Sequence, residues 1–210
     1  MIRSLKEALF NPVDIAPLVF FRIVFGFLMA VESLGAILIG FVHEAYIEPK
    51  FHFSYFIFSW LEPLPGQGMV WLYVFMTLVS LMIMVGFWYR LACFLFFLCF
   101  TYGFLIEKAH YINHHYLAAL LGFILVFMPA HQYFSVDARR NPSLRKTHIS
   151  YWPIFLLVFQ MSMVYIFGGF AKINTDWLAA LPLQHWFSGK TDYFIIGPWL
   201  AMDSTPYLFA

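Results

Sequence analysis

Residues 69–106 read MVWLYVFMTLVSLMIMVGFWYRLACFLFFLCFTYGFLI and contain one charged side chain, that of Arg90. A helix that crosses the hydrocarbon core of a bilayer needs roughly 20 mostly apolar residues. The run is therefore long enough for two spans, and Arg90 marks the turn between them. We predict one span over Met69–Trp88 and the next over Leu91–Ile106.

Three further apolar segments, Ile15–Val42, Tyr111–Ala130 and Tyr151–Ala171, have the length and composition of spans. Hydrophobic residues make up 62% of the chain and charged residues only 11%, whereas about a quarter of a soluble domain is charged. Too few charges remain to cover a water-exposed globule. We predict an all-α polytopic membrane helix bundle with about five transmembrane helices in a lipid bilayer. Residues 43–67 and Asp176–Trp186 are predicted to be interfacial or re-entrant segments.

The short loops carry the orientation signal, because Lys and Arg are enriched on the cytoplasmic side of a membrane. Arg3 and Lys6 precede the first span, Arg90 follows the second, and residues 137–146 form the most basic loop. With five spans, these segments all fall on one face. We therefore predict a cytoplasmic N-terminus. Residues 43–67, 107–114 and those after Ala171 would then face the periplasm, the exterior or the ER lumen.

Residues 1–210 are predicted to form a single transmembrane domain. We expect it to be incomplete at the C-terminus, because Ile195–Trp199 resembles the start of further structure. The sequence contains no P-loop, dinucleotide fingerprint, nucleophile elbow, CxxC or HExxH motif. The basic loop is explained by topology, so no nucleic-acid partner is expected.

Lys172 lies at the non-cytoplasmic end of the last predicted span. Helical spacing places Tyr165, Gly168 and Lys172 on one face, and Gly168 leaves room for a flat ligand beside the lysine. Desolvation near the apolar boundary disfavours an ammonium group, and a neutral amine can act as a general base. Two other interpretations stay open: a lysine that extends to the interface, or an ion pair with Asp176.

Asn113 and His114 begin the fourth predicted span, and topology brings them to the same membrane face as Lys172. His110 and His114 have the i, i+4 spacing of metal ligands, but no third ligand has suitable spacing, so no metal site is expected. His110 and His115 are interpreted as interfacial histidines.

Arg22 and Glu32 both lie within the first predicted span. Buried charges are usually partnered, so the sequence favours an internal ion pair or hydrogen bonds to other helices. Asn174-Thr-Asp176 is typical of a helix stop followed by the cap of a new helix. We therefore interpret Arg22, Asp176 and the adjoining Trp177 as structural polar residues.

A family resemblance extends over residues 11–187, in order and at nearly constant spacing. Its motifs are PVD (12–14), FR (21–22), FGFLM (25–29), VGFWYRLAC (85–93), NH and YL (113–114 and 116–117), FM (127–128), SVD (135–137) and the stretch 165–177. These motifs resemble the membrane domain of the vitamin K-dependent gamma-carboxylases and, more broadly, the bacterial HTTM (horizontally transferred transmembrane) proteins.

The resemblance implies a gamma-glutamyl carboxylase-like lyase and vitamin K epoxidase. Lys172 aligns with the family's base, which deprotonates a reduced vitamin K hydroquinone or menaquinol. O2 and CO2 are co-substrates, and no metal is implied. The quinol reacts with O2, and the basic species formed removes a γ-proton from a glutamate of a protein substrate, to which CO2 then adds. Asn113, His114 and Tyr165 align with residues that line the quinone pocket.

The chain departs from the family in two respects. It lacks the large extracytoplasmic β-rich region and the later membrane helices, and it has Leu183-Gln184-His185 where relatives often place an arginine. Two alternatives therefore stay open. The chain could be a quinone- or lipid-binding membrane protein without catalysis, or an inactive fragment that needs further helices.

Overall fold

The computed structural model describes residues 5–190, 197–200 and 202. Ile195 and Ile196, part of the expected start of further structure, lie outside the described residues. The chain divides into two compact units, residues 1–155 and 156–210.

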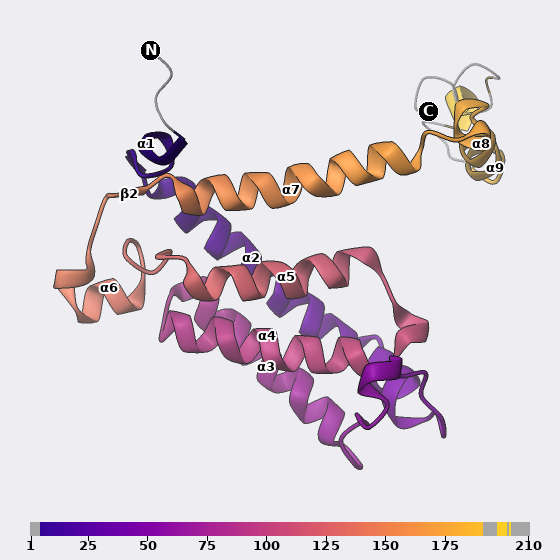
Figure 1. Ribbon diagram of the computed structural model, residues 1–210. Coiled ribbons are helices and arrows are strands. Elements are labelled where there is room, and N and C mark those ends of the chain that lie inside the picture. Colours follow the sequence, from indigo (N-terminus) through magenta and orange to yellow (C-terminus); the bar gives the residue numbers. More distant parts are fainter. Residues whose placement is uncertain (1–4, 191–196, 201, 203–210) are drawn as a thin grey trace. The chain divides into compact units, whose positions relative to one another are not determined.

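The first unit is built around four apolar helices that lie side by side (Figure 1). Helix α3 packs against both α2 and α4, and α4 also packs against α5. Fully buried side chains such as Leu18, Met76 and Phe96 fill the spaces between these helices. The bounds are Ala16–Leu38 for α2, Gly68–Val85 for α3, Tyr89–Ile106 for α4 and Asn113–Phe127 for α5.

Four described helices are long and apolar enough to cross a membrane: α2, α3, α4 and α7 (Trp152–Ala171). The predicted all-α polytopic membrane helix bundle is therefore confirmed. Helix α5 is apolar but has 15 residues, which at about 1.5 Å per residue is shorter than a typical hydrocarbon core of about 30 Å. It is shorter than predicted because Ile112 and Met128 are extended, and Met128 precedes Pro129, which disfavours helix.

Glycines set the ends of two membrane helices. Helix α3 ends at Gly86, which has φ +68° and donates its N–H to the Ile83 carbonyl at 3.1 Å. A residue in the left-handed conformation just after a helix commonly donates hydrogen bonds to the last carbonyls of that helix. Glycine adopts this conformation without the steric penalty of a Cβ. Gly40, with φ +82°, likewise follows α2, so α2 ends before the predicted Val42. A π-helix, His43–Ile47, and a short 3-10 helix, Phe56–Phe58, follow within the predicted interfacial segment.

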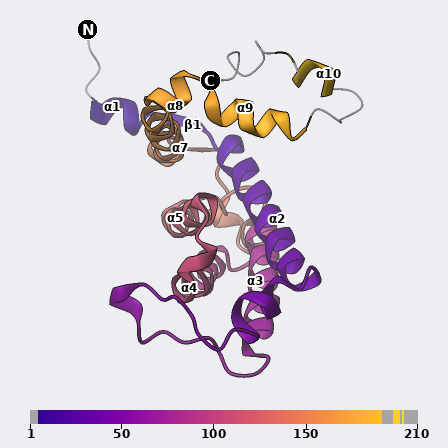
Figure 2. The same cartoon turned by 90° about the vertical axis from the view of Figure 1, so that its right-hand side faces the viewer.

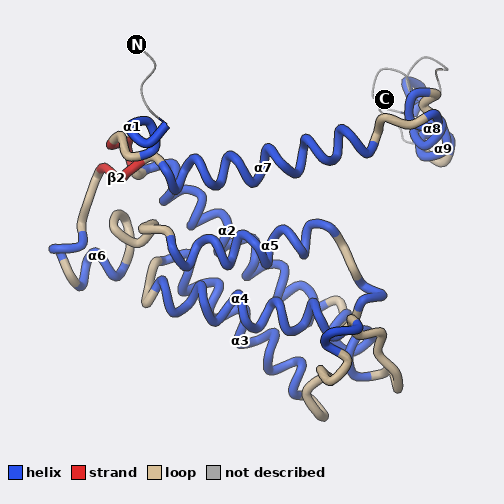
Figure 3. Tube along the Cα trace, in the orientation of Figure 1, coloured by secondary structure: helices blue, strands red, loops and turns tan. Residues whose placement is uncertain are grey.

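A small ribbon joins two distant parts of the first unit. Strands β1 (Pro12–Asp14) and β2 (His148–Ser150) pair antiparallel, with Val13 opposite Ile149 (Figure 3). Short helices accompany them: α1 (Leu5–Leu9), α6 (Val136–Arg140) and the 3-10 helix Pro142–Leu144. A further 3-10 helix, Lys108–His110, lies between α4 and α5. The ribbon fixes the basic loop next to the start of α2.

Two charged side chains of the first unit bind backbone groups instead of each other. The guanidinium of Arg22, fully buried, donates to the carbonyl oxygens of Ala130 at 3.0 Å and Phe134 at 2.7 Å. The Asp137 carboxylate accepts from the N–H groups of Trp88 at 2.9 Å and Tyr89 at 3.0 Å. Asp137 thus caps the N-terminus of α4, where unpaired N–H groups favour an anion.

The second unit contains most of α7, then α8 (Thr175–Leu178), α9 (Leu181–Ser188) and α10 (Gly197–Leu200) (Figure 2). The segment predicted as Asp176–Trp186 forms two short helices instead of one. The break lies at Ala180, which has φ +56°, and a proline follows at the start of α9, where it is tolerated. The indole rings of Trp177 and Trp186 meet edge to face at 5.9 Å.

Candidate functional site

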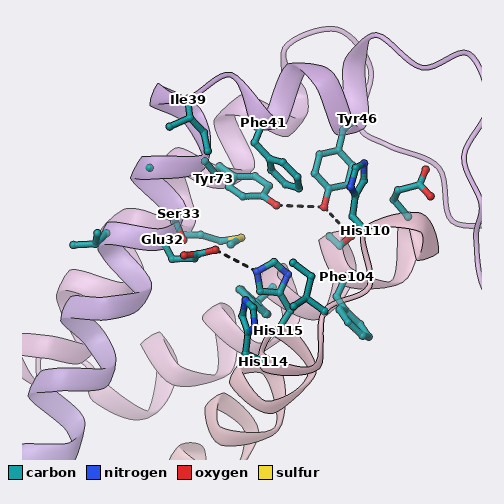
Figure 4. A pocket seen from close by; sticks show the side chains of 18 residues that line it. Glu32, Ser33, Ile39, Phe41, Tyr46, Tyr73, Phe104, His110, His114 and His115 are labelled. Carbon is teal, nitrogen blue, oxygen red and sulfur yellow. Dashed lines mark hydrogen bonds and ion pairs between the residues drawn. The ribbon is translucent and has the colours of Figure 1, made fainter. Parts of the chain in front are cut away.

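A cavity of about 420 Å³ lies inside the first unit, near the C-terminal ends of α2 and α4 and the N-terminal end of α5 (Figure 4). Its volume falls in the range of ligand pockets, about 300–1,000 Å³. Apolar and aromatic side chains form most of its wall, including Phe41, Met76, Phe100 and Phe104. The polar and titratable side chains that line it are Glu32, Ser33, Tyr46, Tyr73, Glu107, His110, His114 and His115.

A carboxylate–imidazole pair spans the cavity from α2 to α5. Oε1 of Glu32 lies 3.2 Å from Nε2 of His115, and Figure 4 shows the two side chains pointing toward one another. The Glu32 side chain is 51% exposed and that of His115 22%. The imidazole packs edge-on against the Phe100 ring at 5.8 Å. The sequence favoured an interfacial role for His115, whereas the structure places it in this pair.

Two tyrosines on the opposite side of the cavity form a hydrogen-bond chain. The hydroxyl of Tyr73 donates to that of Tyr46 at 3.3 Å, and Tyr46 donates to the Gly103 carbonyl at 3.2 Å. Burial raises the pKa of the Tyr46 hydroxyl, and the nearby Glu107 raises it further, while the hydrogen bond with Tyr73 opposes the shift. Tyr46 therefore stays a neutral phenol that keeps its proton.

Glu107 closes the cavity end by holding two loops together. Its Oε1 accepts from the Ala109 N–H at 2.9 Å, which caps a short 3-10 helix. Its Oε2 accepts from the Phe53 N–H at 3.3 Å and lies 3.2 Å from Nδ1 of His52. This buried carboxylate thus anchors the segment after α2 to the turn between α4 and α5.

Ser33 stands out because its Oγ is buried, lines the cavity and has no hydrogen-bond partner among the described residues. Buried polar atoms are rarely left unpaired. No sequence pattern singled out Ser33, Tyr46 or Tyr73. Isolated tyrosines near helix ends resemble ordinary interfacial aromatics. Glu32 did carry a signal, as an ionisable residue inside an apolar span.

The two predicted site residues of α5 behave differently. His114 lines the cavity, and its ring meets that of His115 edge to face at 5.0 Å. Asn113 is the first residue of α5, is exposed and is absent from the cavity wall. No group of three or more His, Cys, Asp or Glu side chains within the described parts of the chain could hold a metal ion.

Lys172, the predicted base, belongs to the second unit and follows the last residue of α7. Its side chain is exposed, and its Nζ lies 4.6 Å from the centroid of the Trp177 ring. Ammonium groups are attracted to the face of an indole. Asn174 caps α8: its Oδ1 accepts a hydrogen bond from the backbone N–H of Trp177 at 3.0 Å, which positions Trp177. No ion pair joins Lys172 to Asp176 in the part of the chain that the structure describes.

Tyr165 and Gly168 lie on α7 within the same unit. The Tyr165 side chain is 75% exposed, and a Cβ added at Gly168 would meet no atom within 4 Å. The open space at Gly168 is compatible with a flat ligand. Little of α7 is buried within the structure: only 6% of its most apolar stretch is buried, as expected of a helix that contacts lipid or other helices.

The comparisons with known proteins yield one family. A family model described as the HTTM domain matches residues 10–210, which covers both compact units. No solved structure matches the chain.

Proposed function

Because this chain belongs to the HTTM domain family, we propose that it is a membrane enzyme that oxidises a reduced quinone. The HTTM domain is associated with the vitamin K-dependent carboxylases. In this proposal the substrate is reduced vitamin K or menaquinol, O2 and CO2 are co-substrates, and a protein-bound glutamate is carboxylated. One quinol, O2, CO2 and glutamate give one epoxide, one γ-carboxyglutamate, one proton and one water.

The observation that carries the proposal is the cavity beside His114. Its wall is mainly aromatic and aliphatic, which suits a fused ring, and it contains a few polar side chains that can hydrogen-bond to ring hydroxyls. The buried Ser33 hydroxyl has no partner among the described residues. The polar side chains of the cavity therefore fit a quinol headgroup, whose two hydroxyls need hydrogen-bond partners.

Lys172 acts in this proposal as the base that accepts the quinol proton. A neutral amine is effective in this role when it lies within hydrogen-bond reach of the hydroxyl. The sequence assigns Asn113, His114 and Tyr165 to the binding of the ring and Gly168 to the space beside it. The predicted orientation assigns Lys172 and His114 to the same membrane face.

A second candidate function is quinone or lipid binding without turnover. The position of Lys172 Nζ over the Trp177 ring favours it, because the face of an indole attracts an ammonium group. An ammonium group has no lone pair with which to accept a proton.

Epoxide formation by the purified protein in lipid nanodiscs tests the proposal. Reduced vitamin K and O2 are added, and the epoxide is measured by liquid chromatography and mass spectrometry. Removal of a general base typically costs about 10²–10⁴ in rate, so Lys172→Ala should lower the rate by at least about 100-fold. Lys190→Ala, which removes another exposed lysine of the second unit, should leave the rate unchanged. If the wild-type protein forms no epoxide, the enzymatic function is refuted and only the binding function remains.

A further inference from the structure

We propose that the cavity of the first unit selects the reduced, dihydroxy form of an aromatic quinone against its oxidised, dicarbonyl form. The ligand class rests on the proposed function, but the selectivity follows from the hydrogen bonds of the cavity itself. A hydroquinone offers two O–H donors, whereas a quinone offers only acceptors. The cavity therefore discriminates between the two if its fixed polar groups present acceptors.

His115 presents the first acceptor. Its Nε2 lies 3.2 Å from Glu32 Oε1, and an ionised carboxylate can only accept hydrogen bonds. The hydrogen of a neutral imidazole must then sit on Nε2, because the partner of one ring nitrogen fixes the tautomer. Nδ1 is left with a lone pair. A cavity ligand that meets this nitrogen must donate to it.

Tyr73 presents the second acceptor. Its hydroxyl hydrogen is used on Tyr46, whose own hydrogen is used on the Gly103 carbonyl. The direction of the chain is fixed by its end, because a carbonyl oxygen cannot donate. The Tyr73 oxygen therefore faces the ligand as an acceptor. Figure 4 shows the tyrosine pair and the Glu32–His115 pair as separate polar features of the same cavity.

The other polar groups do not reverse this preference. Glu107 already accepts from the Ala109 and Phe53 N–H groups and, as a carboxylate, could only add acceptor capacity. The Ser33 hydroxyl can donate or accept, so it serves either redox form equally. His110 and His114 can change tautomer, so they also favour neither redox form of the ligand.

The preference has a consequence for turnover. A quinol loses both hydroxyl hydrogens when it is oxidised to a quinone or an epoxide, so the product cannot donate to His115 or Tyr73. Acceptors that a bound ligand shields from water without donating to them are unfavourable. The cavity therefore binds substrate more tightly than product, which promotes product release.

The expected size follows from the number of hydrogen bonds. One hydrogen bond contributes a net of about 0.5–1.5 kcal/mol, which corresponds to roughly 2- to 13-fold in affinity. Two bonds then predict a preference for the quinol of roughly 5- to 150-fold. The binding of menadiol and menadione to the full chain in nanodiscs, measured by calorimetry under argon, gives this ratio. The dimethyl ether of menadiol keeps the reduced ring but lacks both donors, and it should bind as weakly as menadione.

Two variants locate the effect. Tyr73→Phe removes one acceptor and should lower the quinol preference by roughly 2- to 13-fold. Glu32→Gln frees the His115 tautomer, because an amide can also donate, and should lower the preference by increasing menadione affinity. Tyr102→Phe is the matched control for Tyr73→Phe, since its hydroxyl donates to the Glu62 carbonyl at 2.6 Å and lies outside the cavity wall. Glu48→Gln, an exposed carboxylate outside the wall, is the control for Glu32→Gln.

The outcomes separate this inference from the proposed function. Equal affinity for menadiol, its dimethyl ether and menadione would overturn the inference, even if Lys172→Ala abolished epoxide formation. A quinol preference that is undiminished in both Tyr73→Phe and Glu32→Gln would overturn it as well. A quinol preference that is lowered in the two cavity variants and unchanged in the two controls would support it, even if the wild-type protein formed no epoxide.

Discussion

Gly26 of α2 lies against the backbone of Met84 in α3, and a Cβ added to Gly26 would stand 2.5 Å from the Met84 nitrogen. The same Cβ would stand 2.8 Å from the Ser80 carbonyl oxygen. These neighbours are backbone atoms, which cannot move away as a flexible side chain could. Close approach of membrane helices through small residues is a common mode of packing.

Gly26→Ala should therefore destabilise the first unit by about 1–3 kcal/mol, the usual cost of overpacking. The thermal unfolding midpoint in detergent micelles measures this change. Gly35→Ala, on the same helix with no atom within 4 Å of the added Cβ, should be neutral or stabilising by up to about 1 kcal/mol. Equal midpoints for the two variants would contradict the close helix contact.

Asp137→Asn should weaken the cap of α4. The carboxylate accepts hydrogen bonds from the N–H groups of Trp88 and Tyr89. Loss of a helix cap lowers the free energy of unfolding by about 0.5–2 kcal/mol. An amide at this position can still accept one hydrogen bond, so we expect the lower half of that range, and Asp137→Ala should cost more. Equilibrium unfolding of both variants provides the measurement, and a ranking in the reverse order would argue against the cap.

His131 should make the stability of the protein depend on pH. Burial lowers the pKa of this imidazole below 6.5, Arg90 and Arg22 lower it further, and Asp137 opposes the shift. The unfolded chain then binds a proton more readily than the folded one, so stability falls as the pH drops below about 6.5. One such group changes stability by at most about 1.4 kcal/mol per pH unit.

His131→Phe provides the comparison, since it retains a ring to stack on Tyr89, whose centroid lies 5.4 Å away. The unfolding midpoint of the variant should decline less between pH 7 and pH 5 than that of the wild-type protein. An equal decline of the unfolding midpoint in the two proteins would exclude His131 as the source of the pH dependence.

The predicted orientation can be tested by cysteine labelling in intact cells. Cys93 and Cys99 are first replaced by serine. A cysteine at the exposed Ser59 should react with an impermeant maleimide from outside. A cysteine at Ser143, exposed in the basic loop, should react only after permeabilisation. If the cysteine at Ser143 reacts in intact cells and the one at Ser59 reacts only after permeabilisation, the N-terminus lies outside the cytoplasm.

The sequence predicted the membrane helices well because hydrophobic length dominates the choice of span. It predicted their ends less well, since these depend on local backbone features such as Gly40 and the extended Met128 before Pro129. Charges inside the spans were visible in the sequence, yet their partners were not. Arg22 meets two carbonyls and Glu32 meets His115, and both contacts depend on how separate helices pack.

The candidate site was only partly visible for the same reason. His114 could be singled out from its place at a helix start, and the structure finds it in a cavity wall. The Tyr73–Tyr46–Gly103 chain joins three segments that are far apart in sequence, so no local pattern predicts it. The roles of Lys172, Asn113, Tyr165 and Gly168 remain predictions that rest on the proposed function.

The most direct test of the proposed chemistry is the fate of molecular oxygen. The protein in nanodiscs is supplied with reduced vitamin K under ¹⁸O2, and the epoxide is analysed by mass spectrometry. We predict epoxide that carries one ¹⁸O atom from the wild-type protein and from Lys190→Ala, and a loss of at least about 100-fold in Lys172→Ala. Labelled epoxide formed equally well by Lys172→Ala would contradict the assignment of this lysine as the base.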